Sequence, residues 1–503
     1  MKIVSVGSSG HDASYAFFDT DLKDPIEFAS ATERYNREKK SKHWPKQCTT
    51  AILNRDYDIM VSNQSKMFAL KYCPNEILNE ISHWMDHHEA HVASAFYTRP
   101  WESYEDTVIM VIDGQDGPSV NQGYSRLISN SIWKYDGEKF IKIHEDFSAH
   151  GGVYKLISGT WLGLGHNQEG TAMALHALGE YNELYAEMYE HLRQHHIAKR
   201  NDVLRNSDKR FVFDKTGLKT IEKYFPKKAL RAKHNLDLIL SKTDPNWQAN
   251  LAHTMQKIIM DHMVEYATLA RKHGSKLCFA GGVAQNIMGN SLIRNIFDDM
   301  HMPSDPTDGG LPLGAGLHEW SKCTGKNRIN LDNAYLGYDI KQNVNPKQVV
   351  DYILKHKVCG IANGKAEWGP RALGNRSLIG DVRYDIKDTV NKIKRRQYYR
   401  PFGPVILEEE FDKWFEGHTN GYMQYVCKPK HEHKSVIHID GTSRVQTVTS
   451  NSKSVIRPIL EEYYERTGVP MLLNTSLNIK GQPMVNDENH ARDFEKEYGV
   501  KVF

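Results

Sequence analysis

Three short apolar runs, each ending in a glycine-rich turn, limit the folds that this chain can adopt. They occupy residues 2–10, 107–117 and 276–286. Each run has the length of a buried strand, while residues 182–200 and 248–274 between them carry apolar side chains at the helical period. Buried strands that alternate with long helices predict an α/β fold in which helices cover the sheets.

A change in the sequence pattern near residue 340 divides the chain into two predicted domains. Glycine, asparagine and proline cluster there, and a new α/β pattern begins near Gln348. A length of 503 residues, with 40% hydrophobic residues, exceeds one folding unit and suffices for more than one buried core. We therefore expect a first domain over residues 1–342 and a second over 347–503.

The charge balance and the lack of long apolar stretches argue against two classes of partner. The formal net charge is only +3, so we expect no nucleic-acid polymer. No stretch approaches about 20 uninterrupted apolar residues and the first residues do not resemble a signal peptide, so we expect no membrane partner. The six cysteines form no C-x-x-C pair, as is usual in a reducing compartment. The prediction is a soluble, cytoplasmic protein.

Two histidines in the first domain have the spacing of metal ligands. His87 and His91 are four residues apart in a helix-compatible run, so both imidazoles project from one face and can share a cation. A third, anionic ligand is needed, and Asp308 lies on a glycine-rich turn where the backbone can approach a metal closely. The alternative is a solvated pair of surface histidines, because the chain has 25 histidines.

The glycine-rich turns are candidate phosphate sites, since backbone N–H groups at such turns bind anions. The candidates after the second and third runs are Gly114, Gly281, Gly282 and Asn286. Taken one at a time, each turn is equally explained as a plain structural turn.

His11 and Asp12 follow the first run, where an imidazole or a carboxylate can accept a proton from an attacking hydroxyl. The alternative for this pair is stabilisation of the turn.

The second domain carries basic residues in segments punctuated by glycine and proline, unlike a solvated helix face. Lys394 and Arg396 are expected on the same side of an extended segment, where two cations need a resident anion or nearby acids. Other polar groups able to bind phosphate or carbonyl oxygens are Arg371, Arg376, Arg444, Ser476 and Asn478. Each basic segment alone can be solvated, but together they predict a small polyanionic ligand.

Several long motifs give the chain a close resemblance to a known enzyme family. They include SSGHDAS from residue 8, DHHEAHVASAF from 86, AEWGPRALGNRS from 366, KIKRRQYYRPFGP from 392 and LLNTSLN from 472. With these motifs the chain resembles the O-carbamoyltransferases of nodulation-factor and antibiotic biosynthesis, over nearly its whole length.

The resemblance implies a fold and an activity. The first domain is expected to be actin-like and similar to the tRNA threonylcarbamoyl-transfer enzymes, and the second to be YrdC-like. The second domain would convert carbamoyl phosphate and ATP to carbamoyl-adenylate. The first would transfer the carbamoyl group to a hydroxyl of a small-molecule acceptor. That acceptor is left open among sugars, antibiotics and hydroxymethyl-pyrimidine nucleotides, and a homodimer is one alternative for the oligomeric state.

The resemblance also assigns residues. His87, His91 and Asp308 match the family's metal ligands, with Fe(II) or another divalent metal expected, and Mg²⁺ expected with ATP. His11 matches the histidine at the transfer site and is the candidate base, with Asp12 beside it. The remaining matches concern ligand binding. Lys39 lies in the family's basic turn, where it either neutralises the adenylate or is solvated, and the K-x-R and S-x-N signatures fall on Lys394, Arg396, Ser476 and Asn478.

Two other functions share part of this pattern. A tRNA-modifying threonylcarbamoyl transferase would share the metal pair, but the fused second domain and weak net charge argue against a tRNA substrate. A non-catalytic, actin-like ATP-binding protein would explain the glycine turns but not the arginine-rich second domain.

Overall fold

The computed structural model describes most of the chain as two compact units. The described residues are 1–7, 11–63, 72–114, 128–165, 167–205, 240–241, 244–331 and 333–503. The first unit combines Met1–Ser103 with His301–Phe503, and the second is Tyr104–Met300. The predicted domain boundary between residues 342 and 347 falls inside the first unit and stays a prediction. Ser8–Gly10 and residues 115–117 of the predicted turns lie outside the described residues.

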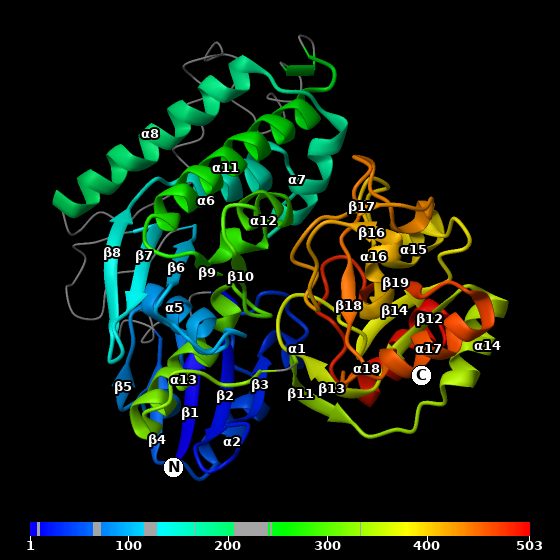
Figure 1. Ribbon diagram of the computed structural model, residues 1–503, viewed down its shortest axis with the longest axis horizontal. Helices are drawn as coiled ribbons and strands as arrows, with labels where there is room; N and C mark the ends of the chain where they lie inside the picture. Colours follow the sequence, from blue (N-terminus) through cyan, green and yellow to red (C-terminus); the bar gives the residue numbers. More distant parts are fainter. Residues whose placement is uncertain are drawn as a thin grey trace. The chain divides into compact units, whose positions relative to one another are not determined.

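A five-stranded sheet forms the amino-terminal part of the first unit (Figure 1). Its strand order is β3-β2-β1-β4-β5; β2 pairs antiparallel with β1 and β3, whereas β4 is parallel to β1 and β5. The strands are β1 (Lys2–Gly7), β2 (Ser14–Asp19), β3 (Ile26–Ala31), β4 (Ile59–Ser62) and β5 (His83–Trp84).

Alternation along β2 explains how both faces of this sheet are covered. Tyr15 and Phe17 join a buried cluster with residues of α2 (Lys46–Leu53) and α4 (Asn75–Leu78). Phe18 points the other way, because successive strand side chains alternate between faces, and it lies against Gly316 of α13 (Leu311–Thr324).

The second unit repeats the same arrangement of strands. Its sheet order is β10-β9-β6-β7-β8, in which β7 pairs antiparallel with β6 and β8, and β6 pairs parallel with β9. In both sheets the three strands of an antiparallel meander are followed by a strand parallel to the first. This duplicated topology confirms the expected actin-like class. The strands are β6 (Thr107–Ile112), β7 (Asn130–Tyr135), β8 (Phe140–Asp146), β9 (Lys276–Ala280) and β10 (Asp299–His301).

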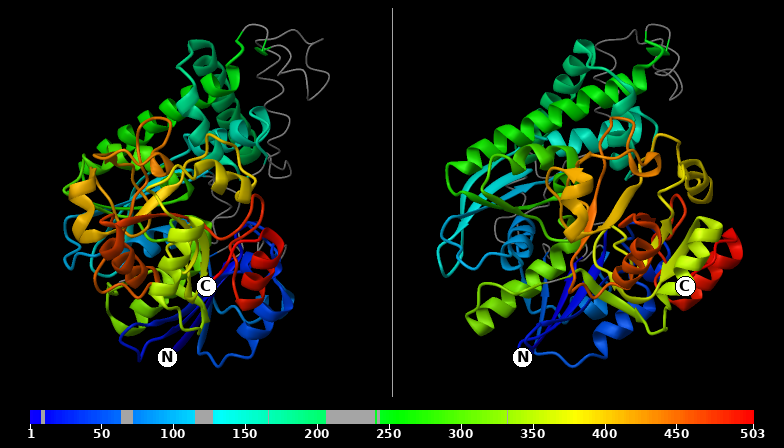
Figure 2. Two further views of the ribbon diagram at one scale, coloured as in Figure 1. Left: turned by 90° about the vertical axis from the view of Figure 1, so that its right-hand side faces the viewer. Right: turned by 45° about the vertical axis from the view of Figure 1, so that its right-hand side comes forward.

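Helices accompany the second sheet (Figure 2), and two of them are long and lie on the segments 182–200 and 248–274, whose apolar pattern predicted helices. They are α6 (His150–Leu156), α7 (Glu169–Leu175), α8 (Glu183–Arg205), α11 (Trp247–Arg271) and α12 (Ile287–Arg294). No helix in the described part of the chain combines the length and the apolar character needed to cross a bilayer.

The carboxy-terminal part of the first unit is a second α/β layer structure, as the sequence predicts. Its five-stranded sheet has the order β12-β14-β19-β15-β18 and is antiparallel except for the β15–β18 pair. The strands are β12 (Val358–Ala362), β14 (Arg376–Gly380), β15 (Gly403–Leu407), β18 (Gln446–Val448) and β19 (Met471–Ser476).

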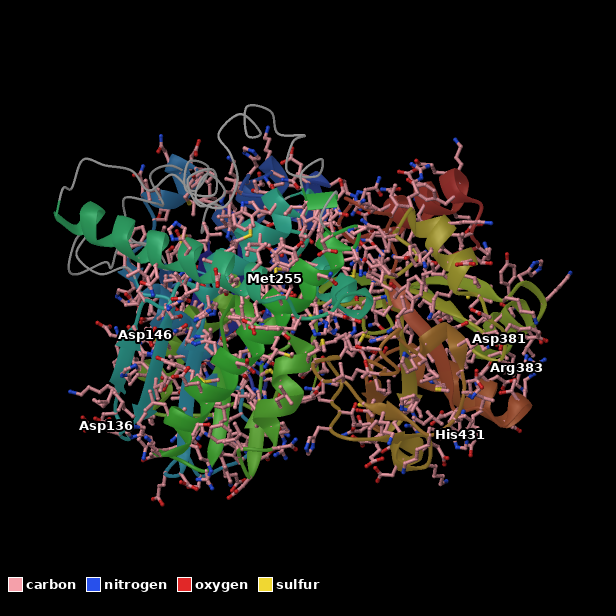
Figure 3. The ribbon with its side chains drawn as sticks, turned by 90° about the horizontal axis from the view of Figure 1, so that it is seen from above. Asp136, Asp146, Met255, Asp381, Arg383 and His431 are labelled. Carbon is pink, nitrogen blue, oxygen red and sulfur yellow. The ribbon has the colours of Figure 1, made fainter. Side chains whose placement is uncertain are left out.

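Two buried clusters lie on this sheet. One contains residues of α14 (Pro346–His356) and α17 (Ile456–Thr467), and the other contains residues of α15 (Lys387–Lys394) and α18 (Glu488–Tyr498). Just after β14, Asp381 is fully buried and accepts hydrogen bonds from Arg383 and Tyr463, and Figure 3 labels Asp381 and Arg383. The short elements β16 (Phe415–Glu416), β17 (Lys428–Pro429) and α16 (Phe411–Trp414) complete this part.

Within the first unit, the amino-terminal and carboxy-terminal parts are joined through main-chain carbonyls. The linking strand β11 (Tyr335–Ile340) pairs with β13 (Gly364–Glu367). Buried Arg34 on α1 (Glu33–Asn36) donates to the carbonyls of Val485 and Glu367. Arg37 donates in the same way to Met484 and Pro483, so the α1 turn is fixed against the carboxy-terminal part.

Candidate active site

The histidine pair stands at the start of α5 (His87–Tyr97), as the spacing predicts. Asp86 caps this helix, because its side chain accepts hydrogen bonds from the backbone N–H groups of His88 and Glu89. The helical register places the His87 and His91 rings on one face, with centroids 4.9 Å apart and ring planes at 80°.

Close packing of two helices brings Asp308 to this pair. Asp308 begins the short 3-10 helix η5 (Asp308–Gly310), which leads directly into α13. On α13, a Cβ added at Gly314 would lie 2.9 Å from Ser94 N, so only glycine lets α13 approach α5 this closely. Ser14 on β2 donates a hydrogen bond of 2.9 Å to Gly309 O and holds η5 from the sheet side.

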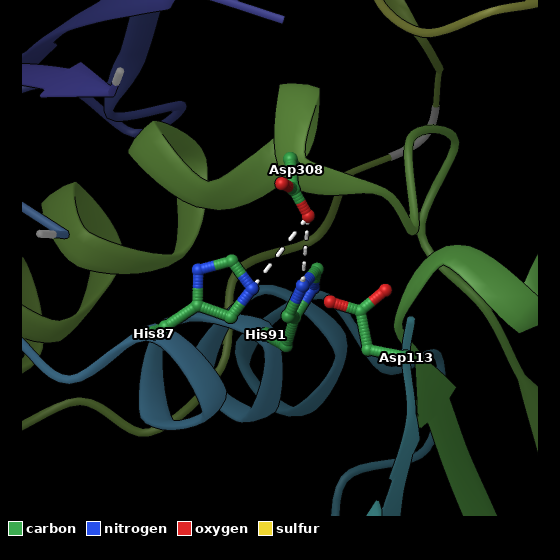
Figure 4. A group of neighbouring side chains, drawn as sticks. All are labelled: His87, His91, Asp113 and Asp308. Carbon is green, nitrogen blue, oxygen red and sulfur yellow. Dashed lines mark ion pairs between the residues drawn. The ribbon is translucent and has the colours of Figure 1, made fainter. Parts of the chain in front are cut away.

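The three side chains converge with the spacing of metal ligands (Figure 4). The Nε2 atoms of His87 and His91 lie 3.6 Å and 3.5 Å from Asp308 Oδ1. Two atoms that coordinate one ion at about 2.1 Å and a tetrahedral angle are about 3.4 Å apart. The separations therefore fit two imidazoles and a carboxylate around one divalent ion. Asp113, which is also drawn in Figure 4, belongs to the second unit.

The electrostatics of Asp308 suit a metal ligand. Burial by itself raises the pKa of its carboxyl, but the nearby imidazoles of His87, His91 and His11 outweigh it and hold that pKa well below the usual range. An ionised carboxylate together with two imidazoles is a donor set of oxygen and nitrogen atoms that accepts Fe(II), Zn(II) or Mn(II).

His11 and Asp12 lie beside this cluster. His11 Nδ1 is 2.9 Å from Asp12 Oδ2, and His11 Nε2 is 3.7 Å from Asp308 Oδ2. Burial raises the pKa of Asp12, but Lys40, 3.8 Å away, and His11 lower it overall, so Asp12 is ionised and only accepts. The hydrogen of a neutral His11 therefore sits on Nδ1, which leaves Nε2 as a proton acceptor next to Asp308.

The predicted glycine turns of the second unit lie side by side. Strands β6 and β9 pair in parallel, so Gly114 and Gly281–Gly282 follow adjacent strands at one sheet edge. Gly281 has φ +99°, and a Cβ there would lie 2.7 Å from Ile112 C, so the turn requires glycine. Asn286 instead caps α12 and is hydrogen-bonded to Gln256. Its side chain thus has a structural task that the sequence did not indicate.

Four arginines of the carboxy-terminal part form a cluster of like charge, which we call the arginine cluster: Arg371, Arg396, Arg400 and Arg444. Burial lowers the pKa of each guanidinium, and for Arg371, Arg396 and Arg444 the charges of other members lower it further, for Arg371 to about 10. In the described part of the chain, the buried Nε atoms of Arg396 and Arg444 have no hydrogen-bond partner. Such donors indicate a site built for an anion.

Arg400 was not among the predicted site residues. Its signal in the sequence is its position four residues after Arg396 in the same basic segment.

Lys394 of the K-x-R signature meets Ser476 and Asn478 of the S-x-N signature. It ends α15 and so does not lie in the extended segment that was expected to hold it beside Arg396. The fully buried Lys394 ammonium donates to Ser476 O, to Ser476 Oγ at 3.3 Å, and to the backbone and side-chain oxygens of Asn478 at 2.8 and 3.0 Å. Its pKa lies well below the ordinary value because of burial and of the neighbouring Arg396, Arg400 and Lys39. The lysine therefore holds the turn after β19 in place.

Arg376 does not join the arginine cluster, which corrects the prediction from sequence. Its side chain is fully buried, and its guanidinium donates only to main-chain carbonyls in the hydrogen bonds observed. The acceptors are the carbonyls of Tyr338, Asn363, Gly364, Asn375 and Asn486. Arg376 thus supports the fold of this region and has little capacity left for a ligand.

Lys39 lies on the α1 turn, close to the arginine cluster. It keeps access to solvent, yet the protein around it and the charges of Arg400 and Arg396 outweigh Glu33 and lower its pKa to about 8. Lys39 therefore lies within electrostatic reach of Arg396 and Arg400 while it remains exposed to solvent.

Family comparisons assign both parts of the chain. Residues 14–317 match the model for the carbamoyltransferase amino terminus, and residues 350–503 match that for the carbamoyltransferase carboxy terminus. The nodulation protein NolO of Bradyrhizobium diazoefficiens is 28% identical over 446 residues, which are 81% of this chain and 75% of NolO. Nodulation protein U of Sinorhizobium fredii is 28% identical over 79% of this chain and 72% of its own length.

Among solved structures, the activator of 2-hydroxyisocaproyl-CoA dehydratase from Clostridium difficile, with bound ADPNP, is similar with a TM-score of 0.36 and 12% identity. The similarity covers 65% of this chain and 96% of the activator. The two family matches together span most of the chain, so this protein belongs to the carbamoyltransferase family and is a carbamoyltransferase enzyme.

Proposed function

We propose that the protein is an ATP-dependent O-carbamoyltransferase that makes carbamoyl-adenylate from carbamoyl phosphate and ATP and transfers the carbamoyl group to a small-molecule hydroxyl. The observation that carries this proposal is the arginine cluster. Four half-buried guanidinium groups that repel one another, two of them with a buried Nε that lacks a hydrogen-bond partner among the described residues, need a compact anion, and carbamoyl phosphate supplies several acceptor oxygens.

In the first half-reaction, water cleaves carbamoyl phosphate to carbamate and phosphate. A carbamate oxygen then attacks the α-phosphorus of ATP, and pyrophosphate leaves. The arginine cluster neutralises the phosphoryl oxygens during these steps. Lys394 keeps Ser476 and Asn478 in place beside the cluster. The adjacent turns at Gly114 and Gly281 supply backbone N–H groups for ATP or adenylate phosphates, with Mg²⁺ accompanying the nucleotide, whereas the N–H of Gly282 donates to Asp113 Oδ1.

In the second half-reaction, the acceptor hydroxyl attacks the carbamoyl carbon, and the bond from that carbon to the adenylate oxygen breaks. His11 Nε2 takes the hydroxyl proton, and Asp12 at Nδ1 holds the imidazole in the tautomer that this requires. His87, His91 and Asp308 hold a divalent metal, with Fe(II) favoured. When bound, this ion supplies Lewis acidity and an orienting charge for phosphate oxygens. AMP and the O-carbamoyl product leave.

An imidazole base suits an acceptor that carries a hydroxyl. The family resemblance supplies sugars and hydroxylated antibiotics as acceptors to compare, and hydroxymethyl-pyrimidine nucleotides are a further alternative. Incubation with ATP, carbamoyl phosphate and each candidate should give a mass gain of one carbamoyl group on one class. Transfer to tRNA instead would contradict the proposal.

Paired variants test whether the two half-reactions take place at separate sites. We expect His91→Ala to abolish carbamoyl transfer while pyrophosphate release from carbamoyl phosphate and ATP continues. Arg396→Ala should stop pyrophosphate release, yet transfer from pre-formed carbamoyl-adenylate should survive. Thr419→Val, a change outside both sites, serves as the control. Equal loss of both half-reactions in both variants would refute separate sites.

A further inference from the structure

The loop that leads to Asp308 is held at two points by the carboxy-terminal part of the first unit. Residues 302–307 connect β10 to η5, and Pro303, Ser304 and Asp305 are buried. The loop braces itself, because Asp305 Oδ1 accepts hydrogen bonds from Thr307 N at 3.1 Å and from Thr307 Oγ1 at 2.6 Å. A movement at its start is therefore transmitted to Asp308.

The first point of contact is Gly369. It has φ +112°, and a Cβ added there would lie 2.6 Å from Ser304 O and 3.3 Å from Asp305 Cβ. Only glycine allows the backbone to approach the loop this closely. Arg371 of the arginine cluster follows two residues later on the same turn.

The second point of contact is Gln424. Its side chain is 6% exposed, and Nε2 donates a buried hydrogen bond of 2.7 Å to Pro303 O. Asn420 Nδ2 donates to Gln424 Oε1 at 2.7 Å, which fixes the amide so that its donor end faces Pro303.

The backbone of Asn420 connects this contact to the turn that carries Arg371, because it pairs with Gln446 in an isolated parallel β-bridge. The side chain of Gln446 in turn donates from Nε2 to Leu373 O at 2.8 Å. Asn474 Nδ2 donates to Gln446 Oε1 at 2.7 Å and to Ala372 O at 3.1 Å. Both contacts with the loop thus originate from one scaffold, which also supports the arginine cluster.

We infer that Gln424 is a positioning residue for the metal site: through Pro303 it sets the place of Asp308 relative to His87 and His91. This inference rests on the proposed function, since it assumes that these three side chains bind a divalent metal. Loss of the Gln424 donor leaves a buried carbonyl unsatisfied and frees the start of the loop. Supporting residues of this kind change metal affinity by about 10- to 100-fold.

Metal titration of the full chain tests the role of Gln424. Gln424→Met keeps the length of the side chain without its donor, and Asn420→Ala leaves the loop contact but frees the amide to rotate. We expect the dissociation constants for Fe²⁺ (measured without oxygen) and Zn²⁺ to rise about 10- to 100-fold in Gln424→Met and less in Asn420→Ala. Amide hydrogen exchange of residues 303–310 should speed up in the same order, and pyrophosphate release should fall less than about three-fold.

Thr419→Val is the matched control, because Thr419 Oγ1 donates to Val445 O from the same segment without reaching the loop. Its metal affinity should equal that of the parent. Unchanged metal affinity in folded Gln424→Met, or a parallel loss of metal binding and pyrophosphate release, would overturn the inference alone. A parent protein that binds neither metal would overturn both the inference and the proposed metal site.

Discussion

Replacing Arg371 by methionine should stabilise the ligand-free protein and remove its response to carbamoyl phosphate. Burial, followed by the charge of Arg400, lowers the pKa of Arg371 from 12.5 to about 10. This shift corresponds to about 3 kcal/mol of unfavourable free energy for holding the charge. Arg371 retains some exposure, so screening reduces the gain expected on removing the charge to about 1 to 2 kcal/mol.

Carbamoyl phosphate should reverse the order of stability of the parent and Arg371→Met. At a concentration of 100 times its Kd, carbamoyl phosphate stabilises a protein that binds it only in the folded state by about 2.7 kcal/mol. The parent should therefore gain stability on addition of the ligand, and Arg371→Met should not. Scanning calorimetry with and without carbamoyl phosphate measures both effects, with the two units treated as separate transitions where they resolve.

An arginine with an acidic partner provides the control, because its replacement should lower the stability that Arg371→Met is expected to raise. Arg383 donates to both carboxylate oxygens of the buried Asp381, at 3.0 and 2.8 Å. Arg383→Met leaves that carboxylate without its main partner and should cost about 3 kcal/mol. Were Arg371→Met to destabilise the ligand-free protein as Arg383→Met does, or to keep the response to carbamoyl phosphate, the account of the arginine cluster would be wrong.

Three further predictions concern the fold. Burial lowers the pKa of His262 to about 4, so as the pH falls the unfolded chain takes up the proton before the folded protein does. The stability present above about pH 6.5 should therefore fall by up to about 1.4 kcal/mol per pH unit towards pH 4. Denaturant midpoints should depend less on pH in His262→Gln than in the parent, and an equal pH dependence in the two proteins would contradict this prediction. Gly281→Ala should destabilise the second unit by about 2 kcal/mol or more, because its Cβ meets the Ile112 backbone. Gly114→Ala, whose Cβ would meet none of the described residues closer than 3.9 Å, should change the unfolding free energy by less than about 0.5 kcal/mol. Arg376→Met should cost at least about 3 kcal/mol, since several buried carbonyls lose their donor, and a calorimetric change as small as that of a surface variant would refute its structural role.

Short-range patterns in the sequence predicted the parts of the site that the chain builds locally. The spacing of His87 and His91 was enough to place both imidazoles on one face, because one helical turn puts residues four apart on the same side, whereas their role as metal ligands came from the family resemblance. The runs that became β1, β6 and β9 were recognisable for the same reason, since a buried strand needs only a short apolar stretch and a turn that ends it. The meeting of Lys394 with Ser476 and Asn478 came from the family resemblance, because no local pattern connects segments so far apart.

Residues with similar local sequence patterns have different roles in the tertiary structure. Arg371 and Arg376 lie in one motif, yet Arg371 faces other cations whereas Arg376 is surrounded by carbonyls. Asn286 follows a glycine turn as a phosphate-binding residue would, but its amide is used by α12 and Gln256. Gln424 gave no signal at all, because its importance comes from a single carbonyl of a distant loop.

By itself, the sequence determined the α/β class, the helical histidine pair and a surplus of cations in the second half of the chain. Only the tertiary structure decided which cations face one another, and it alone set Asp308 between the histidines through the packing of α13 on α5. The physical reason is the range of the interactions. Periodicity and turn preferences act over a few residues, whereas burial, charge repulsion and hydrogen-bond partners depend on which distant segments the fold brings into contact.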